Sequence, residues 1–155
     1  IAQRTDTGLI DAYAYYGPQR TKDPKDLGCR DVVLTTYETL VRDVLGPFPP
    51  NSTKSPLLSI TWDRVILDEA HMIKNPLSRR AKAVRALPSR TRWAVTGTPL
   101  QNEMGELFSL MRFLEYAPFN HSQVWDVWVR NSTERASTLL RAIMLRRTKT
   151  MKGLD

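Results

Sequence analysis

The stretch "VILDEAHMIKN" (residues 65–75) joins three aliphatic residues directly to two adjacent acids, Asp68 and Glu69. With Arg64 in front, the apolar part predicts a buried strand over 64–70. Carboxylates resist burial unless they are paired or bind a cation. The end of this strand therefore has two interpretations. It is a strand that reaches the surface, or a site where acids hold magnesium and water to split a nucleotide.

Three other segments, 9–17, 31–37 and 92–98, have the β-branched or aromatic composition of strands. Amphipathic segments follow them. Helices are predicted over 38–45, 122–130 and 134–146. Another is predicted over 76–87, with an Asn75-Pro76 start and an inward face of Leu77, Ala81, Val84 and Leu87. A further helix follows a cap at Asn102 and buries Leu107, Leu110, Met111 and Leu114. The polar segments 20–28 and 46–56 are predicted as loops, and Trp125 and Trp128 as core anchors. The predicted fold class is α/β, a parallel sheet with helices on both faces and a helical C-terminal third.

Ligands of parallel sheets bind beyond the carboxyl ends of the strands. Asp68-Glu69 and Thr96-Gly97-Thr98 both lie at such ends, so the two groups share one edge if their strands are neighbours. At this edge Asp68 can hold Mg²⁺ through water, and Glu69 can orient the water that attacks a γ-phosphate. His71 can pass the state of the site to neighbouring elements. The alternative is a pair of solvated acids beside a surface histidine.

The segment "AVTGTPLQN" (94–102) offers the hydroxyls of Thr96 and Thr98 on either side of Gly97. Gly97 permits a tight backbone path, and Pro99 holds Thr98 extended. Such a segment can sense a phosphate or a metal through hydrogen bonds. Taken alone, it is also an ordinary strand-to-helix turn.

The 155-residue chain carries a formal net charge of +7 and has a sequence pI of about 9.9. This balance fits either a polyanionic partner, nucleic acid first, or a generic basic surface. Cys29 is the single cysteine, which excludes an internal disulfide and a zinc cluster. That usage fits a reducing compartment, cytosol or nucleus. No apolar run is long enough to span a membrane.

Taken together, these motifs resemble the superfamily-two helicase-like ATPases, and more narrowly the SWI/SNF-type DNA translocases. The matching pieces are "YYGPQR" (15–20), "DVVLTTYETL" (31–40), "WDRVILDEAHMIKN" (62–75), "RWAVTGTPLQNEMGELFSLMRFL" (92–114) and "MLRRTK" (144–149). The four-residue DEAH box is weak alone, whereas its combination with "TGTPLQN" is specific. The resemblance covers nearly the whole chain in the family's order and implies ATP and Mg²⁺ as cofactors.

The resemblance also implies a role for each matching position. Asp68 and Glu69 match the Walker B acids, with Asp68 as the metal-holding residue, and His71 completes their box. The motif that couples nucleotide state to DNA movement is matched by Thr96, Gly97, Thr98, Pro99, Leu100, Gln101 and Asn102. Contacts to DNA are implied for Thr35, Thr36, Tyr37 and Lys74. For Thr35 and Thr36, simple β-propensity is the alternative.

The chain departs from the family pattern in one respect. No glycine is followed by Lys and then Ser or Thr, so the phosphate-cradling loop is absent from it. We therefore expect an incomplete RecA-like lobe over 1–116 and a helical extension over 117–155 that leads to a second motor lobe. The expected partners are double-stranded DNA or chromatin in the nucleus, with no membrane. The rivals are a non-catalytic DNA- or protein-binding module and a metal-dependent hydrolase with Asp68, Glu69 and His71 as ligands.

Overall fold

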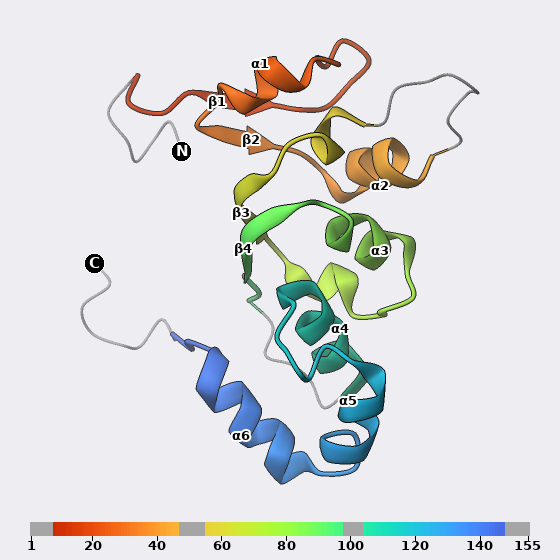
Figure 1. Cartoon of the computed structure of the whole chain (residues 1–155). Coiled ribbons are helices and arrows are strands. Elements are labelled where there is room, and N and C mark those ends of the chain that lie inside the picture. Colours follow the sequence, from red (N-terminus) through yellow and green to blue (C-terminus); the bar gives the residue numbers. More distant parts are fainter. Residues whose placement is uncertain (1–7, 47–54, 98–103, 148–155) are drawn as a thin grey trace.

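The computed structural model describes residues 8–46, 55–97 and 104–147, and Figure 1 shows the order of its elements. The described strands are β1 (Ala12–Ala14), β2 (Val32–Leu34), β3 (Trp62–Leu67) and β4 (Ser89–Ala94). The helices are α1 (Pro24–Gly28), α2 (Tyr37–Leu45), α3 (Arg79–Arg85), α4 (Met104–Leu114), α5 (Ser122–Trp128) and α6 (Thr133–Ile143). Two short 3₁₀ helices are η1 (Pro56–Leu58) and η2 (Ala70–Ile73). After α4 the described residues contain helices and no strand, as predicted.

The strands pair in parallel, β1 with β2 and β3 with β4, as two separately hydrogen-bonded sheets. In the second pair Ile66 lies opposite Trp93, and Leu67 lies opposite Ala94. Parallel neighbours need a crossover connection, and α3 supplies it between β3 and β4. The predicted fold class, parallel strands flanked by helices, is confirmed. Each predicted strand segment overlaps a strand.

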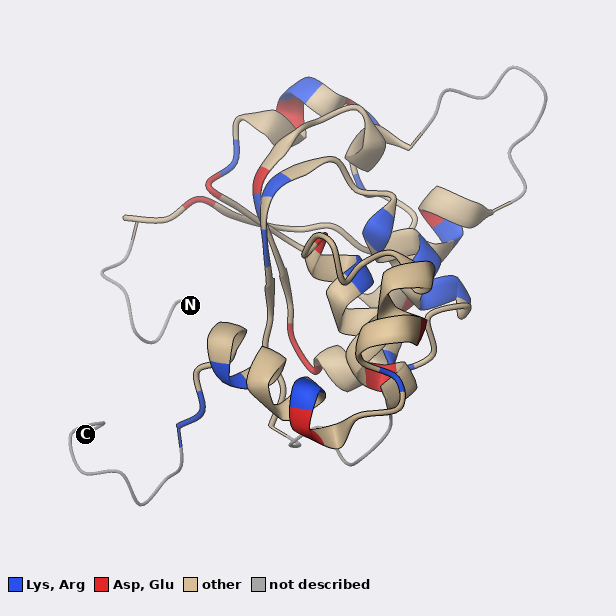
Figure 2. Ribbon diagram, turned by 60° about the horizontal axis from the view of Figure 1, so that its bottom comes forward, with Lys and Arg blue, Asp and Glu red and all other residues tan. Residues whose placement is uncertain are grey.

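The two faces of the β3–β4 pair differ in what covers them. Helices α3 and α4, with α2 beside α3, lie to one side of these strands (Figures 1 and 2). The apolar side chains buried among these elements include Leu40, Leu67, Val84, Leu107, Met111 and Phe113. On the other side, Ile66 is 58% and Trp93 57% exposed. The prediction of helices on both faces is therefore wrong for β3–β4 within the described ranges, because Ile66, Trp93 and Val95 form an open face there.

Helix α3 begins later than predicted. Asn75 does not cap it, because the Asn75 side chain accepts a hydrogen bond from the Leu77 N–H at 2.9 Å and forms a local turn. The cap is Ser78, whose side chain accepts from the N–H of Ala81. Leu77 thus precedes the helix and is 70% exposed, contrary to its predicted inward position. Ala81, Val84 and Leu87 are buried, as predicted.

The polar segments predicted as loops contain short helices. In 20–28, Asp23 caps α1 by accepting from Lys25 N–H, and Leu27 is fully buried. One leucine with a capping acid is enough to dock a single turn against the core. Most of 46–56 lies outside the described residues, but its end forms η1 with Pro56 buried.

Helices α4, α5 and α6 account for the helical last third. The predicted cap of α4, Asn102, lies outside the described residues, whereas Leu107, Leu110 and Met111 are buried and Leu114 is partly buried. Trp125 is 1% exposed and packs against Phe108, with 5.3 Å between ring centroids. The prediction that Trp128 is also a core anchor is wrong. It is 57% exposed, and the Arg135 guanidinium lies over its ring.

Candidate functional site

The ends of β3 and β4 lie side by side. Their pairing continues beyond the last strand residues, since Val95 N–H donates to Leu67 O at 2.8 Å and Ala70 N–H donates to Val95 O at 2.9 Å. Asp68 and Glu69 thus leave the sheet next to Thr96 and Gly97. The predicted condition, that the two strands are neighbours and their ends share one edge, is met. Thr98 and Gln101, which were assigned to the same coupling motif, lie outside the described residues.

The acid pair sits in a sharp turn between β3 and η2. Glu69 adopts a left-handed backbone conformation, with φ 50° and ψ 53°. Such a conformation costs a residue with a side chain about 1–2 kcal/mol. It is held by the Glu69 N–H, which donates to Asp68 Oδ1 at 3.0 Å. In a strand, adjacent side chains point to opposite faces. Because the strand ends here, the side chains of the two exposed acids can reach one region.

His71 lies beside Glu69 on a well-anchored turn. Its Nδ1 is 3.1 Å from Glu69 Oε2, an ion-pair distance without the alignment of a hydrogen bond. The same turn, η2, buries Ala70 and Ile73, and the buried Ser109 of α4 donates its hydroxyl proton to Ile73 O. The position of His71 is therefore fixed through α4. In the predicted box, His71 lies next to Glu69, and Asp68 accepts a hydrogen bond from the Glu69 N–H.

Tyr37 connects this cluster to the segment before α2. Its hydroxyl donates to Asp68 O at 2.9 Å, across 31 residues of sequence. Burial, and then the negative charges of Asp68 and Glu69, raise the pKa of Tyr37 to about 12. The sequence assigned Tyr37 to DNA contact. The structure brings its hydroxyl to the acid pair.

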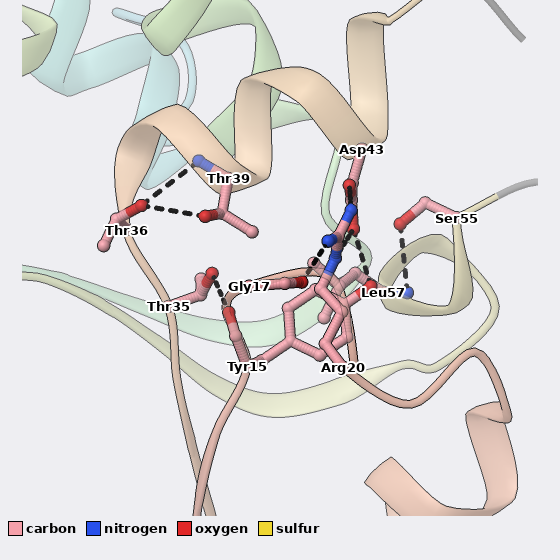
Figure 3. Close-up of polar contacts among 9 residues, drawn as sticks. All are labelled: Tyr15, Gly17, Arg20, Thr35, Thr36, Thr39, Asp43, Ser55 and Leu57. Carbon is pink, nitrogen blue, oxygen red and sulfur yellow. Dashed lines mark hydrogen bonds and ion pairs between the residues drawn. The ribbon is translucent and has the colours of Figure 1, made fainter.

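Thr35 and Thr36 are exposed, but their hydroxyls already have structural partners (Figure 3). Thr35 donates to Tyr15 O at 2.8 Å. Thr36 caps α2 by accepting from Thr39 N–H at 3.1 Å. The oxygen of such a hydroxyl can still accept a hydrogen bond, but a phosphate needs donors. Those donors come from N–H groups and cations. Lys74, also assigned to DNA contact, is exposed at the end of η2.

A partly buried polar cluster of Tyr15, Arg20 and Asp43 lies beside the Thr35–Thr36 segment (Figure 3). The Tyr15 hydroxyl donates to Asp43 Oδ2 at 2.6 Å, and the Arg20 Nε donates to the same oxygen at 3.1 Å. A second Arg20 nitrogen pairs with Asp43 Oδ1. Burial, and then the Asp43 carboxylate, raise the pKa of Tyr15 to about 12. The cluster ties the end of β1 to α2.

We expect Asp43→Ala to lower the free energy of unfolding by about 2 kcal/mol, because the Tyr15 hydroxyl and the Arg20 guanidinium both lose a buried acceptor. The measurement is thermal unfolding of this domain within the full-length protein. Asp63→Ala is the matched control, since it breaks an Asp–Arg pair whose side chains are 86% and 75% exposed. Such an exposed pair contributes about 0–1 kcal/mol. Equal losses in the two variants would show that the Asp43 contacts do not stabilise the fold.

The family profile described as "SNF2-related domain" matches residues 1–152. The chain belongs to the SNF2-related domain family. It is 42% identical over 153 residues to "Helicase-like transcription factor" of Homo sapiens, a match that covers 92% of this chain and 14% of that protein. It is 36% identical over 157 residues to "DNA repair protein RAD5A" of Arabidopsis thaliana, covering 96% of this chain and 15% of that protein. The chain thus spans about a seventh of these relatives, and the predicted resemblance to SWI/SNF-type ATPases is confirmed.

A solved SNF2 structure shares the fold. The "Sulfolobus solfataricus SWI2/SNF2 ATPase core in complex with dsDNA" superposes with a TM-score of 0.71 at 27% sequence identity. The match covers 94% of this chain and 30% of that one. The described strands and helices therefore share the fold of part of that core, and the RecA-like lobe predicted from the sequence motifs is confirmed as their fold.

The acid cluster of this SNF2-related chain has the donor chemistry that magnesium prefers. Mg²⁺ binds one or two carboxylates and keeps several waters. Asp68 and Glu69 are both exposed, and the Glu69 N–H occupies only one Asp68 oxygen. Within the described part of the chain, no three His, Cys, Asp or Glu side chains gather as metal ligands, Asp68, Glu69 and His71 included. No described helix has both the length and the apolar character needed to cross a bilayer.

The residues that sequence reasoning missed are Arg20 and Asp43, and the Tyr37–Asp68 contact. Arg20 and Asp43 are 23 positions apart, and Tyr37 and Asp68 are 31 apart. No helical or strand period links positions so distant, so composition alone carried no signal for them. Asp43 on the buried side of an amphipathic helix was a local signal, because an acid there needs a partner.

Proposed function

We propose that the full-length protein containing this chain hydrolyses ATP to translocate on double-stranded DNA, in chromatin remodelling or DNA repair. The shared edge formed by Asp68-Glu69 and Thr96-Gly97 carries this proposal, because a nucleotide site and its sensor must lie together. Membership of the SNF2-related family supports it. So do relatives named for DNA repair and a neighbour bound to double-stranded DNA.

In this proposal Asp68 holds Mg²⁺ through water, and Glu69 orients and activates the water that attacks the γ-phosphate. The metal, when bound, supplies charge neutralisation at the phosphates. His71, next to Glu69, responds to the state of the site. Thr96, Gly97, Thr98 and Gln101 couple that state to DNA movement. What supports the first two roles is the exposed position of both acids at one strand end.

The DNA-contacting surface is proposed to include Thr35, Thr36, Tyr37 and Lys74. The exposed Lys74 supplies positive charge, and the net charge of +7 favours a polyanion in general. Phosphate contacts carry no sequence information, which suits a motor that moves along any sequence. Because binding to phosphates releases counterions, the affinity of the motor for DNA is expected to fall steeply with salt.

The remaining parts of the motor are proposed to come from the full-length protein. These are the phosphate-cradling loop and a second lobe, approached through the exposed Arg146 and Arg147 after α6. We also propose a boundary near residue 116 between the partial lobe and its helical extension, and a nuclear location. The 155 residues alone lack the loop that binds β- and γ-phosphates, so their own turnover is expected to be negligible.

The test is steady-state phosphate release by the full-length protein, with and without double-stranded DNA of unrelated sequences. We expect turnover to rise with DNA of any sequence and to decline as salt weakens binding. The 155-residue chain is assayed in parallel and is expected to show no measurable turnover. DNA binding by the full-length protein without any hydrolysis would instead favour the non-catalytic module.

A further inference from the structure

A gap separates the two strand pairs next to the acid site. Strands β2 and β3 do not hydrogen-bond to each other, and a cavity of about 250 Å³ lies between them. Its lining includes Thr35, Thr36 and Tyr37 from one side and Ile66, Leu67 and Asp68 from the other. Tyr37 spans this gap, since its hydroxyl reaches Asp68 O. The end of one strand pair is thus tied to the end of the other by a side chain.

The Tyr37 contact falls on the peptide unit that sets the direction of Glu69. In this unit the carbonyl of Asp68 accepts from Tyr37, and the N–H of Glu69 donates to the Asp68 carboxylate. The next amide, Ala70 N–H, is held by Val95 O. A left-handed glutamate persists only when its surroundings hold it there. Loss of the Tyr37 contact leaves the carbonyl side of the unit free to turn, and Glu69 turns with it.

The other end of Tyr37 is fixed to the Thr35–Thr36 segment. Tyr37 is the first residue of α2, directly after the capping Thr36. Thr35 is anchored to Tyr15 O, and Tyr15 N–H donates to Leu34 O. A displacement of residues 35–36 therefore moves the Tyr37 ring as well. The contacts form a continuous path from this exposed segment to Asp68.

From these contacts we infer that Tyr37 is a positioning residue, whose hydroxyl transmits DNA engagement at Thr35–Thr36 to the Asp68–Glu69 peptide. The inference rests on the proposed function and adds a specific route for DNA stimulation of ATP hydrolysis.

The experiment compares Tyr37→Phe with wild type in the full-length protein. The variant removes a single oxygen and keeps the ring. We expect the ratio of DNA-stimulated to basal kcat to fall about two- to tenfold, the loss typical of one neutral hydrogen bond. The KM for ATP and the dissociation constant for DNA are expected to stay within about twofold, because phenylalanine keeps the Tyr37 ring in the proposed DNA-contacting surface and the lost hydroxyl bonds to Asp68 O rather than to a ligand. Tyr13→Phe is the matched control, since the Tyr13 hydroxyl also makes one hydrogen bond, from Thr21 N–H at 2.9 Å.

Hydrogen–deuterium exchange gives a second measurement that does not depend on turnover. Peptides that cover 68–71 are expected to exchange faster in Tyr37→Phe and at the wild-type rate in Tyr13→Phe. Unchanged exchange, an unchanged ratio, or an equal fall of basal and stimulated kcat would each overturn the inference. If the wild-type protein itself does not hydrolyse ATP, the proposed function fails first. If wild type is stimulated and Tyr37→Phe matches it, only the role of Tyr37 fails.

Discussion

We expect Glu69→Gln in the full-length protein to lower kcat for ATP hydrolysis by about 10²- to 10⁴-fold, the usual contribution of a positioned general base. Glutamine keeps the size of the side chain and an oxygen that can approach His71, which lies 3.1 Å from Glu69. It removes the negative charge that activates water. The left-handed backbone at this position is retained at similar cost. ATP binding is therefore expected to stay within about threefold, because the lost interaction belongs to the transition state.

The control is Glu115→Gln. Glu115 and Glu69 are the two non-glycine residues with positive φ in the described ranges, at 54° and 50°. The Glu115 carboxylate is a similarly exposed group, but it pairs with the buried Arg92. We expect this variant to hydrolyse ATP at the wild-type rate. Wild-type hydrolysis by Glu69→Gln would exclude Glu69 as the base of the reaction, whatever the family membership.

The second large effect concerns stability. We expect Trp125→Ala to lower the free energy of unfolding by about 3–5 kcal/mol, the cost of deleting a fully buried aromatic side chain. The indole contacts Phe108 of α4, so its removal leaves a cavity where α4 meets α5. A loss of this size approaches the whole stability of many domains. The measurements are the soluble fraction and the thermal unfolding of the full-length protein.

Trp128→Ala is the matched control, because it removes the same side chain three positions later. Trp128 is 57% exposed, against 1% for Trp125. Its contact with Arg135 contributes at most about 1 kcal/mol at such a site. Losses of similar size in the two variants would mean that the α4–α5 contact does not stabilise the domain.

These two tryptophans also show where prediction from sequence stops. Composition predicts that a tryptophan packs, but it does not say on which side of a short helix the core lies. Leu77 was misplaced for a related reason. Asn75 can serve equally as a helix cap or as a turn-former, and only the competing Ser78 decided between them. Strand segments, by contrast, followed from dense β-branched runs, and their parallel order followed from the intervening helices.

For the candidate site, the sequence predicted which strand ends would meet, because parallel strands with short crossovers align their carboxyl ends. It did not predict the contacts that hold them. The Tyr37 hydroxyl reaches Asp68 only because α2 starts at Tyr37 and points that ring across the gap to β3. The roles of Asp68, Glu69, His71 and the coupling residues stay predictions, and Glu69→Gln tests the role of Glu69.

The uncovered side of β3 and β4 limits how this stretch of sequence can be handled in the laboratory. Parallel strands are ordinarily sandwiched between layers, and a bare surface with Ile66, Trp93 and Val95 adheres to other apolar surfaces. A recombinant polypeptide of these 155 residues is therefore expected to aggregate as its concentration rises. Solution studies of this region call for the longer natural polypeptide, or for polar replacements at Ile66 and Trp93.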